Sequence, residues 1–135
     1  METKIESRVG KINSSSEKVY NFISNFNNFK NLVPPDKVKN WQSTEDHCHF
    51  TVDMIGETGL RIIEKEPYTL VKITGEEGGK FDFFFWIQLK EEATNDTRIK
   101  LTIKADLNPM VKMMASKPLQ KFVDTLIDQL EKMPF

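Results

Sequence analysis

The chain has 135 residues, of which 39% are hydrophobic and 29% are charged, and its formal net charge is −1. A chain of this length and composition can bury enough apolar surface to fold, so we expect one domain spanning residues 1–135 and exclude the disordered and collagen-like classes. Because 19 basic residues are balanced by 20 acidic residues, no excess of positive charge indicates a nucleic-acid partner.

The sequence favours a reducing compartment and predicts no membrane-spanning segment. Its single cysteine, Cys48, leaves no internal disulfide, so a cytoplasmic location is expected. The N-terminus carries charges from position 2 onward, and no run of about 18 apolar residues occurs, so neither a signal peptide nor a membrane span is expected. No cofactor is expected either, since the glycines form neither a phosphate-binding loop nor a dinucleotide-binding motif.

The N-terminal part predicts one strand followed by two short helices. Lys4–Ile12 is the expected first strand, with Ile5 and Val9 on one face. Ser14 and Glu17 form an S-x-x-E capping box ahead of apolar residues spaced three and four apart, which predicts a helix start. A second short helical turn, through Phe29 and Leu32, is expected to end at the Pro-Pro pair that follows.

From residue 38 to residue 105 the pattern changes to short β-like runs separated by turn residues. Connections this short favour an antiparallel meander. The expected strands are Val38–Ser43, His47–Met54, Gly59–Lys65, Leu70–Thr74, Phe81–Glu91 and Thr97–Ala105.

A long amphipathic helix is expected at the C-terminus. Asn108 supplies an N-cap and Pro109 a first helical residue, and an apolar stripe then continues toward Lys132. Pro118 is expected to kink or break this helix, because proline has no backbone N–H to donate.

This order of elements resembles the START-related, or SRPBCC, superfamily of polyketide cyclase/dehydrase and birch-pollen-allergen-like proteins. The resemblance is carried by the segments KINSSSEKVYNFISNFNNFKNLVPP and LRIIEKEPYTLVKITGEEGG and by the terminal amphipathic helix. It implies an α+β helix-grip fold, in which a curved seven-stranded antiparallel sheet wraps a long C-terminal helix and two short helices lie between strands 1 and 2. It also implies a cavity between sheet and helix for an apolar ligand, and it implies no particular reaction.

Strand alternation predicts which side chains face that cavity. The same apolar pattern also fits a solid core, and periodicity does not distinguish the two. The expected ligand is a small hydrophobic molecule, lipid-like, polyketide-like or quinone-like. The expected lining is Phe50, Val52, Met54, Leu60, Ile62, Val71, Ile73, Phe83, Phe85, Ile87, Leu101 and Ile103.

Three methionines are expected at the mouth between helix and sheet: Met110, Met113 and Met114. Methionine is flexible enough to pack against varied apolar shapes, which suits an adaptable portal. Ordinary gap filling in the core is the alternative interpretation.

Glu64 is the candidate for acid–base chemistry in a cyclase- or dehydratase-like enzyme. It shares its parity with Leu60 and Ile62, so regular alternation turns it inward. A one-residue bulge would instead send Glu64 to solvent and Arg61 inside. No nucleophile with a matching base is visible, so the alternative to an enzyme is a binding protein that catalyses nothing.

His47, Cys48 and His49 are close in sequence, yet no metal site is expected. Strand alternation puts both histidines on one face and Cys48 on the other, and the chain contains only these two histidines.

The outer parity of the last two strands carries Phe84 and Trp86, near Arg98, Lys100 and Lys104. This combination fits a partner-binding surface or self-association into a homodimer. Stacking of single-stranded nucleic acid and plain surface packing are the other interpretations.

Overall fold

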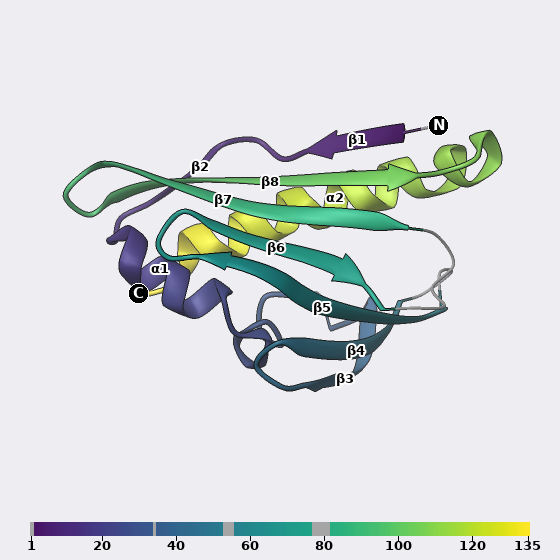
Figure 1. Cartoon of the computed structure of the whole chain (residues 1–135), viewed down its shortest axis with the longest axis horizontal. Coiled ribbons are helices and arrows are strands. Elements are labelled where there is room, and N and C mark those ends of the chain that lie inside the picture. Colours follow the sequence, from purple (N-terminus) through teal and green to yellow (C-terminus); the bar gives the residue numbers. More distant parts are fainter. Residues whose placement is uncertain (1, 34, 53–55, 77–81) are drawn as a thin grey trace.

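A computed structural model describes residues 2–33, 35–52, 56–76 and 82–135. Within these residues eight antiparallel strands form one curved sheet, and a long helix crosses one face of it (Figure 1). This arrangement confirms the α+β helix-grip fold. The strands are β1 (Glu2–Glu6), β2 (Gly10–Ile12), β3 (Val38–Ser43), β4 (His47–Val52), β5 (Gly56–Glu66), β6 (Leu70–Gly75), β7 (Phe83–Ala93) and β8 (Asp96–Asp106), and the helices are α1 (Ser16–Ile23), the 3-10 helix η1 (Phe26–Asn28) and α2 (Pro109–Lys132).

The sheet order is β1-β8-β7-β6-β5-β4-β3, with β2 also paired to β8. The strands from β3 to β8 therefore form the expected meander. The expected strand Lys4–Ile12 is divided into β1 and β2 by a bend at Ser7, whose hydroxyl accepts a hydrogen bond from the Leu101 amide at 2.9 Å and donates to the Arg8 carbonyl at 2.7 Å. The bend changes the parity, so Val9 does not share the buried face of Ile5 and is exposed.

The helix ends follow local capping, with one correction. Ser15, rather than Ser14, caps α1, and its hydroxyl accepts from the Lys18 amide at 3.3 Å. Ser14 is buried instead, and its carbonyl accepts a hydrogen bond from the Thr97 hydroxyl at 2.7 Å. Asn108 caps α2 as expected, accepting from the Val111 amide at 2.9 Å.

Pro118 lies inside α2 and does not break it, since the helix continues from Pro109 to Lys132. In Figure 1 this helix runs behind the sheet, and its first turns extend past the ends of β7 and β8. No helix within the described residues is both long enough and apolar enough to cross a membrane.

The second half of α2 is packed firmly. The helix packs against β1, β2 and β8, which lie at one side of the sheet. Phe22 of α1 meets the C-terminal Phe135 edge to face at 5.3 Å, so α1 covers this end of the interior. The fully buried side chains of the second half of α2 are Val123, Leu126, Ile127 and Leu130.

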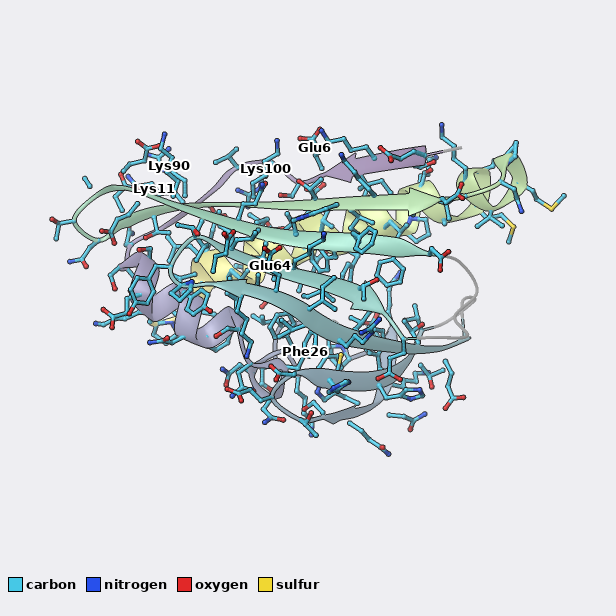
Figure 2. The ribbon with its side chains drawn as sticks, viewed as in Figure 1. Glu6, Lys11, Phe26, Glu64, Lys90 and Lys100 are labelled. Carbon is cyan, nitrogen blue, oxygen red and sulfur yellow. The ribbon has the colours of Figure 1, made fainter. Side chains whose placement is uncertain are left out.

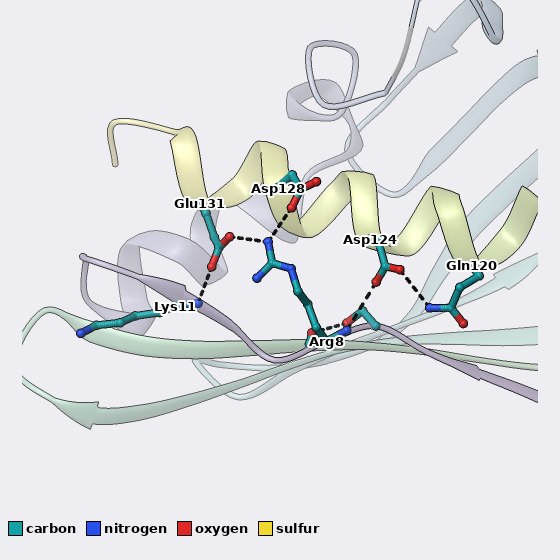
Figure 3. A network of polar contacts seen from close by, with 7 residues as sticks. Arg8, Lys11, Gln120, Asp124, Asp128 and Glu131 are labelled. Carbon is teal, nitrogen blue, oxygen red and sulfur yellow. Dashed lines mark hydrogen bonds and ion pairs between the residues drawn. The ribbon is translucent and has the colours of Figure 1, made fainter.

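An ionic network fastens the same half of α2 to the bend between β1 and β2 (Figure 3). The Arg8 guanidinium donates to the carboxylates of Asp128 and Glu131. Glu131 also accepts from the Lys11 amide at 2.9 Å. These hydrogen bonds, first that from Arg8 and then that from Lys11, hold the pKa of Glu131 below its usual value. We call the second half of α2, Val123–Lys132, with β2 and α1, the closed end.

Candidate functional site

The inner face of the sheet, the face that α2 crosses, loses its cover toward one end. Along β7, Ile87 and Phe85 are 1% and 3% exposed, whereas Phe83, the first residue of the strand, is only half-buried. Along β4, Phe50 is 6% exposed, whereas the last residue, Val52, is half-buried. Both changes occur toward the end of the sheet at which α2 begins (Figure 1).

The first half of α2, which faces this end of the sheet, also carries apolar side chains that are only half-buried. Val111, Leu119 and Phe122 are half-buried and pack against the core, and Phe122 meets Phe85 at a centroid distance of 6.4 Å. We call this part of the molecule the open end: residues 109–122 of α2 together with the ends of β4 and β7. Leu119 and Phe122 were expected as part of an apolar stripe and were not identified as site residues.

Trp41 joins the open-end apolar surface through a bulge in β3. Lys39 pairs with Thr51 and Gln42 with His49, so Asn40 and Trp41 together oppose Phe50. Asn40 has a φ of 58°, which turns the chain. The Trp41 indole stacks on the Phe50 ring with a centroid distance of 5.3 Å and an interplanar angle of 15°. Regular alternation with the buried Val38 would have put Trp41 on the opposite face, so the sequence did not identify it.

The predicted lining residues that the structure describes all lie on the inner face, in two groups. The half-buried group contains Val52, Ile62 and Phe83. Met54 lies outside the described residues. The buried group contains Phe50, Leu60, Val71, Ile73, Phe85, Ile87, Leu101 and Ile103.

The three methionines at the start of α2 are among the most exposed apolar side chains of the described residues. Met110, Met113 and Met114 are 72%, 83% and 63% exposed. They therefore do not fill gaps in the core, and they surround the beginning of α2 at the open end.

The inward orientation of Glu64 does not occur. A bulge between Ile62 and Glu64 inserts Ile63 as an extra residue, and Glu64 then stands opposite Lys72. Glu64 is exposed on the side of the sheet turned away from α2 (Figure 2). The expectation that a bulge would turn Arg61 inside is wrong, because the bulge lies after Arg61. Arg61 stands opposite His47 and Thr74 on the outer face and is half-buried there.

Acid–base groups are scarce in the interior. Among the described residues, no carboxylate, amine, guanidinium or imidazole is buried. Cys48 is buried, and this burial raises the pKa of its thiol to about 12, so the thiol is protonated at neutral pH. The Tyr20 phenol is also buried, and this burial raises its pKa, so the phenol is protonated at neutral pH as well.

His47 and His49 both lie on the outer face. His47 Nδ1 lies 3.4 Å from the Glu76 carboxylate, beside a surface depression of about 270 Å³ that His49 also lines. Within the described part of the chain, no three Asp, Glu, His or Cys side chains are arranged to hold a metal ion. A second depression, of about 280 Å³, lies between the β7–β8 hairpin and Val9, away from the open end.

The outer aromatic pair is accompanied by lysines. The ring centroids of Phe84 and Trp86 lie 5.9 Å apart. Lys72 Nζ lies 4.6 Å from the Phe84 ring centroid and 5.4 Å from the Trp86 ring centroid. Lys104 Nζ lies 5.7 Å from the Trp86 centroid. Lys72 comes from β6 and was not predicted. We call these four residues the outer aromatic cluster.

Two expected cations are held elsewhere. Arg98 donates to Asp96 at 3.0 Å within the β7–β8 hairpin, and Lys100 pairs with Glu6 of β1. The Arg98 guanidinium and the Lys100 ammonium therefore contact carboxylates instead of the aromatic rings.

Comparison with known proteins supports the architecture. Residues 10–133 match the family model of CoxG, which is described as a subunit of carbon monoxide dehydrogenase. No curated protein matches the sequence significantly.

Solved structures match over almost the whole chain at low identity. A START superfamily protein from Mycobacterium smegmatis has 13% identity and a TM-score of 0.68, covering 95% of this chain and 94% of that one. XoxI from Bacillus cereus has 14% identity and a TM-score of 0.72, with coverages of 97% and 93%. Truncated norcoclaurine synthase from Thalictrum flavum has 13% identity and a TM-score of 0.73, with coverages of 98% and 96%. These matches confirm the resemblance to the START-related superfamily at the level of the fold.

Proposed function

The chain belongs to the CoxG family, and from this premise we propose that it binds and carries a small apolar molecule between the inner face of the sheet and the first half of α2. The observation that carries the proposal is the set of half-buried apolar side chains at the open end. Val52 and Phe83 of the sheet and Leu119 and Phe122 of the helix are left partly uncovered on surfaces that face the interior.

Covering these groups would make the binding free energy of an apolar ligand more favourable. Burial of apolar area contributes about 25 cal/mol per Å². Ligand sites are commonly concave, mostly apolar and formed between layers of secondary structure. The exposed methionines Met110, Met113 and Met114 fit an adaptable portal at this end, because unbranched thioether side chains adjust to different shapes.

Carriage is favoured over catalysis by the chemistry of the interior. A cyclase- or dehydratase-like reaction requires a positioned acid or base, and the described interior holds no buried carboxylate, amine or imidazole. Burial raises the pKa of the Tyr20 phenol and of the Cys48 thiol, so neither group is a base at neutral pH. Norcoclaurine synthase, which its name identifies as an enzyme, shares the fold with this chain at 13% identity. An identity this low does not transfer its reaction to this chain.

Native mass spectrometry of the freshly purified protein is the direct test. We expect an excess mass in the native spectrum that disappears in the denatured spectrum of the same sample. A native mass equal to that of the bare chain, together with no binding of an added apolar compound such as 2-isopropylnaphthalene, would contradict the proposal.

A space-filling variant distinguishes a cavity from a solid core. Leu119→Trp adds volume at the half-buried inner side of α2, and we expect the affinity for 2-isopropylnaphthalene to fall at least tenfold with little change in stability. In a solid core the same change overpacks the interior and lowers the free energy of unfolding by about 1–3 kcal/mol. Lys121→Trp adds the same ring on the exposed side of α2 and is the matched control.

A second candidate function is a docking contact through the outer aromatic cluster. Phe84 is 41% exposed, and exposed clusters of aromatic side chains mark interaction surfaces. The family description names one component of a multi-component dehydrogenase, which fits a protein partner. We expect Phe84→Ser with Trp86→Ser to abolish this docking, or homodimer formation if the partner is a second copy. An unchanged oligomeric state and unchanged partner retention on a column would argue against it.

A further inference from the structure

The indole N–H of Trp41 is a polar group with no protein partner inside the open end. Its Nε1 atom is buried and makes no hydrogen bond. The ring is held flat against Phe50, which is 6% exposed on the inner face. The bulge at Asn40 turns this ring to the interior instead of the outer face.

A buried indole N–H without an acceptor is unusual. Tryptophan usually finds an acceptor for its N–H when it is buried, because desolvating the group without a hydrogen bond is unfavourable. Each such group in a native protein therefore calls for an explanation, and an absent ligand is one of them.

Other buried polar atoms near the interior are less informative. The Thr3 hydroxyl also lacks a partner, but Thr3 belongs to β1, the strand against which α2 packs, at the opposite side of the sheet from Trp41. The Asp46 carboxylate is paired with Lys65 at 2.6 Å. Among the described residues, only the Trp41 N–H combines a buried donor with the half-buried apolar surface of the open end.

We propose that Trp41 Nε1 donates a hydrogen bond to a carbonyl oxygen of the bound molecule. The ligand class is therefore apolar molecules that carry a carbonyl group, and pure hydrocarbons bind less well. The Trp41 donor fixes the orientation of the ligand, with its oxygen at the stacked pair Trp41–Phe50 and its apolar part toward Phe83 and Phe122. This inference rests on the proposed function, because it requires a ligand at the open end.

Two compounds of nearly equal shape test the inference. 2-Acetylnaphthalene carries a carbonyl oxygen where 2-isopropylnaphthalene carries a methyl group. The measured quantity is the ratio of the Kd of the isopropyl compound to the Kd of the acetyl compound. We expect this ratio to fall about fivefold from the wild-type protein to Trp41→Phe, as the loss of one neutral hydrogen bond predicts. Trp86→Phe alters the only other tryptophan, on the outer face, and is expected to leave the ratio unchanged.

Nuclear magnetic resonance of the wild-type protein gives a second readout that does not depend on the folding of Trp41→Phe, because the control Trp86→Phe is enough to assign the signals. The chain has two tryptophans and hence two indole N–H signals, which single substitutions assign. We expect the Trp41 indole proton to shift downfield when 2-acetylnaphthalene is added and to shift less when the isopropyl compound is added.

The outcomes separate this inference from the proposed function. A ratio that falls in Trp41→Phe alone, with the downfield shift, supports the inference. If both compounds bind and the ratio of their Kd values is the same in the wild-type protein, Trp41→Phe and Trp86→Phe, the Trp41 hydrogen bond is overturned. The proposed binding of apolar molecules then still stands. Failure of both compounds to bind the wild-type protein overturns the proposed function and this inference together.

Discussion

The two halves of α2 are held in different ways. The closed end combines complete burial of Leu126 and Ile127 with the ionic network of Arg8, whereas the open end offers half-buried Leu119 and Phe122 and exposed methionines. One helix thus serves as an anchor in its second half and as one wall of a candidate site in its first half. Stability and binding are therefore expected to respond to substitutions in different parts of the same element.

The largest effect is expected from a matched pair of leucines on α2. Leu126→Ala removes a side chain that is 2% exposed, and we expect a loss of about 2–5 kcal/mol in the free energy of unfolding. Leu119→Ala, two turns earlier and half-buried, is expected to cost only about 1 kcal/mol, because less area leaves water on folding. Urea denaturation measures both. Equal losses would mean that the two ends are packed alike.

Two glycines test the same contrast through added volume. A Cβ at Gly10 would lie 2.8 Å from Ile127 Cγ2, inside the packed contact between β2 and α2. Gly10→Ala is therefore expected to cost about 1–3 kcal/mol. At Gly59 the same Cβ would meet the end of the flexible Glu76 side chain at 3.0 Å, so Gly59→Ala is expected to change stability by less than about 0.5 kcal/mol. Thermal unfolding of both variants measures the two changes in stability. A smaller loss in Gly10→Ala than in Gly59→Ala would contradict the tighter packing of the closed end.

Removal of the ionic network is expected to have a smaller effect. Arg8→Ala deletes the donor to Asp128 and Glu131, which lie 120 and 123 positions away in the sequence. Because the Arg8 side chain is 46% exposed, we expect a loss of about 1 kcal/mol that shrinks in 1 M salt. Arg98→Ala removes a local pair with Asp96 and is expected to change stability little. A salt-independent loss in Arg8→Ala would indicate lost packing instead of lost charge.

The smallest effect is a pH dependence that belongs to Glu131. Its pKa lies below the usual 4.5 in the folded protein because Arg8 and the Lys11 amide donate to the carboxylate. The contribution of Glu131 to stability is therefore present above the unfolded pKa and is lost as pH falls through the lower folded pKa. The difference in unfolding free energy between the wild-type protein and Glu131→Gln should be present at pH 6 and should narrow as the pH is lowered toward 3. A constant difference over this range would exclude the carboxylate charge as its cause.

Long regular strands were predictable from local alternation. In β7 the sequence correctly separated the buried Phe85 from the exposed Phe84, because each of these residues pairs in unbroken register with β8 from Phe83 to Glu91. The cap and the first turn of α2 were predictable for the same reason, since Asn108 and Pro109 act on their own neighbours.

The candidate site was less predictable because bulges and distant contacts shape it. One extra residue at Ile63 sends Glu64 outward, and one at Asn40–Trp41 brings an indole inward. Such insertions depend on how two strands pair, so local sequence does not reveal them. The Arg8 network likewise depends on residues that meet only in the folded chain.

Cys48 has a practical consequence for measuring these differences. It is the only thiol of the chain, it is 3% exposed in β4, and its pKa is raised to about 12. Alkylating reagents attack thiolates, so modification of the native protein requires that β4 open first. The rate of iodoacetamide labelling, followed by mass, therefore measures how often the sheet opens near Phe50 and Trp41. A bound molecule that closes the open end should slow this labelling in proportion to its occupancy.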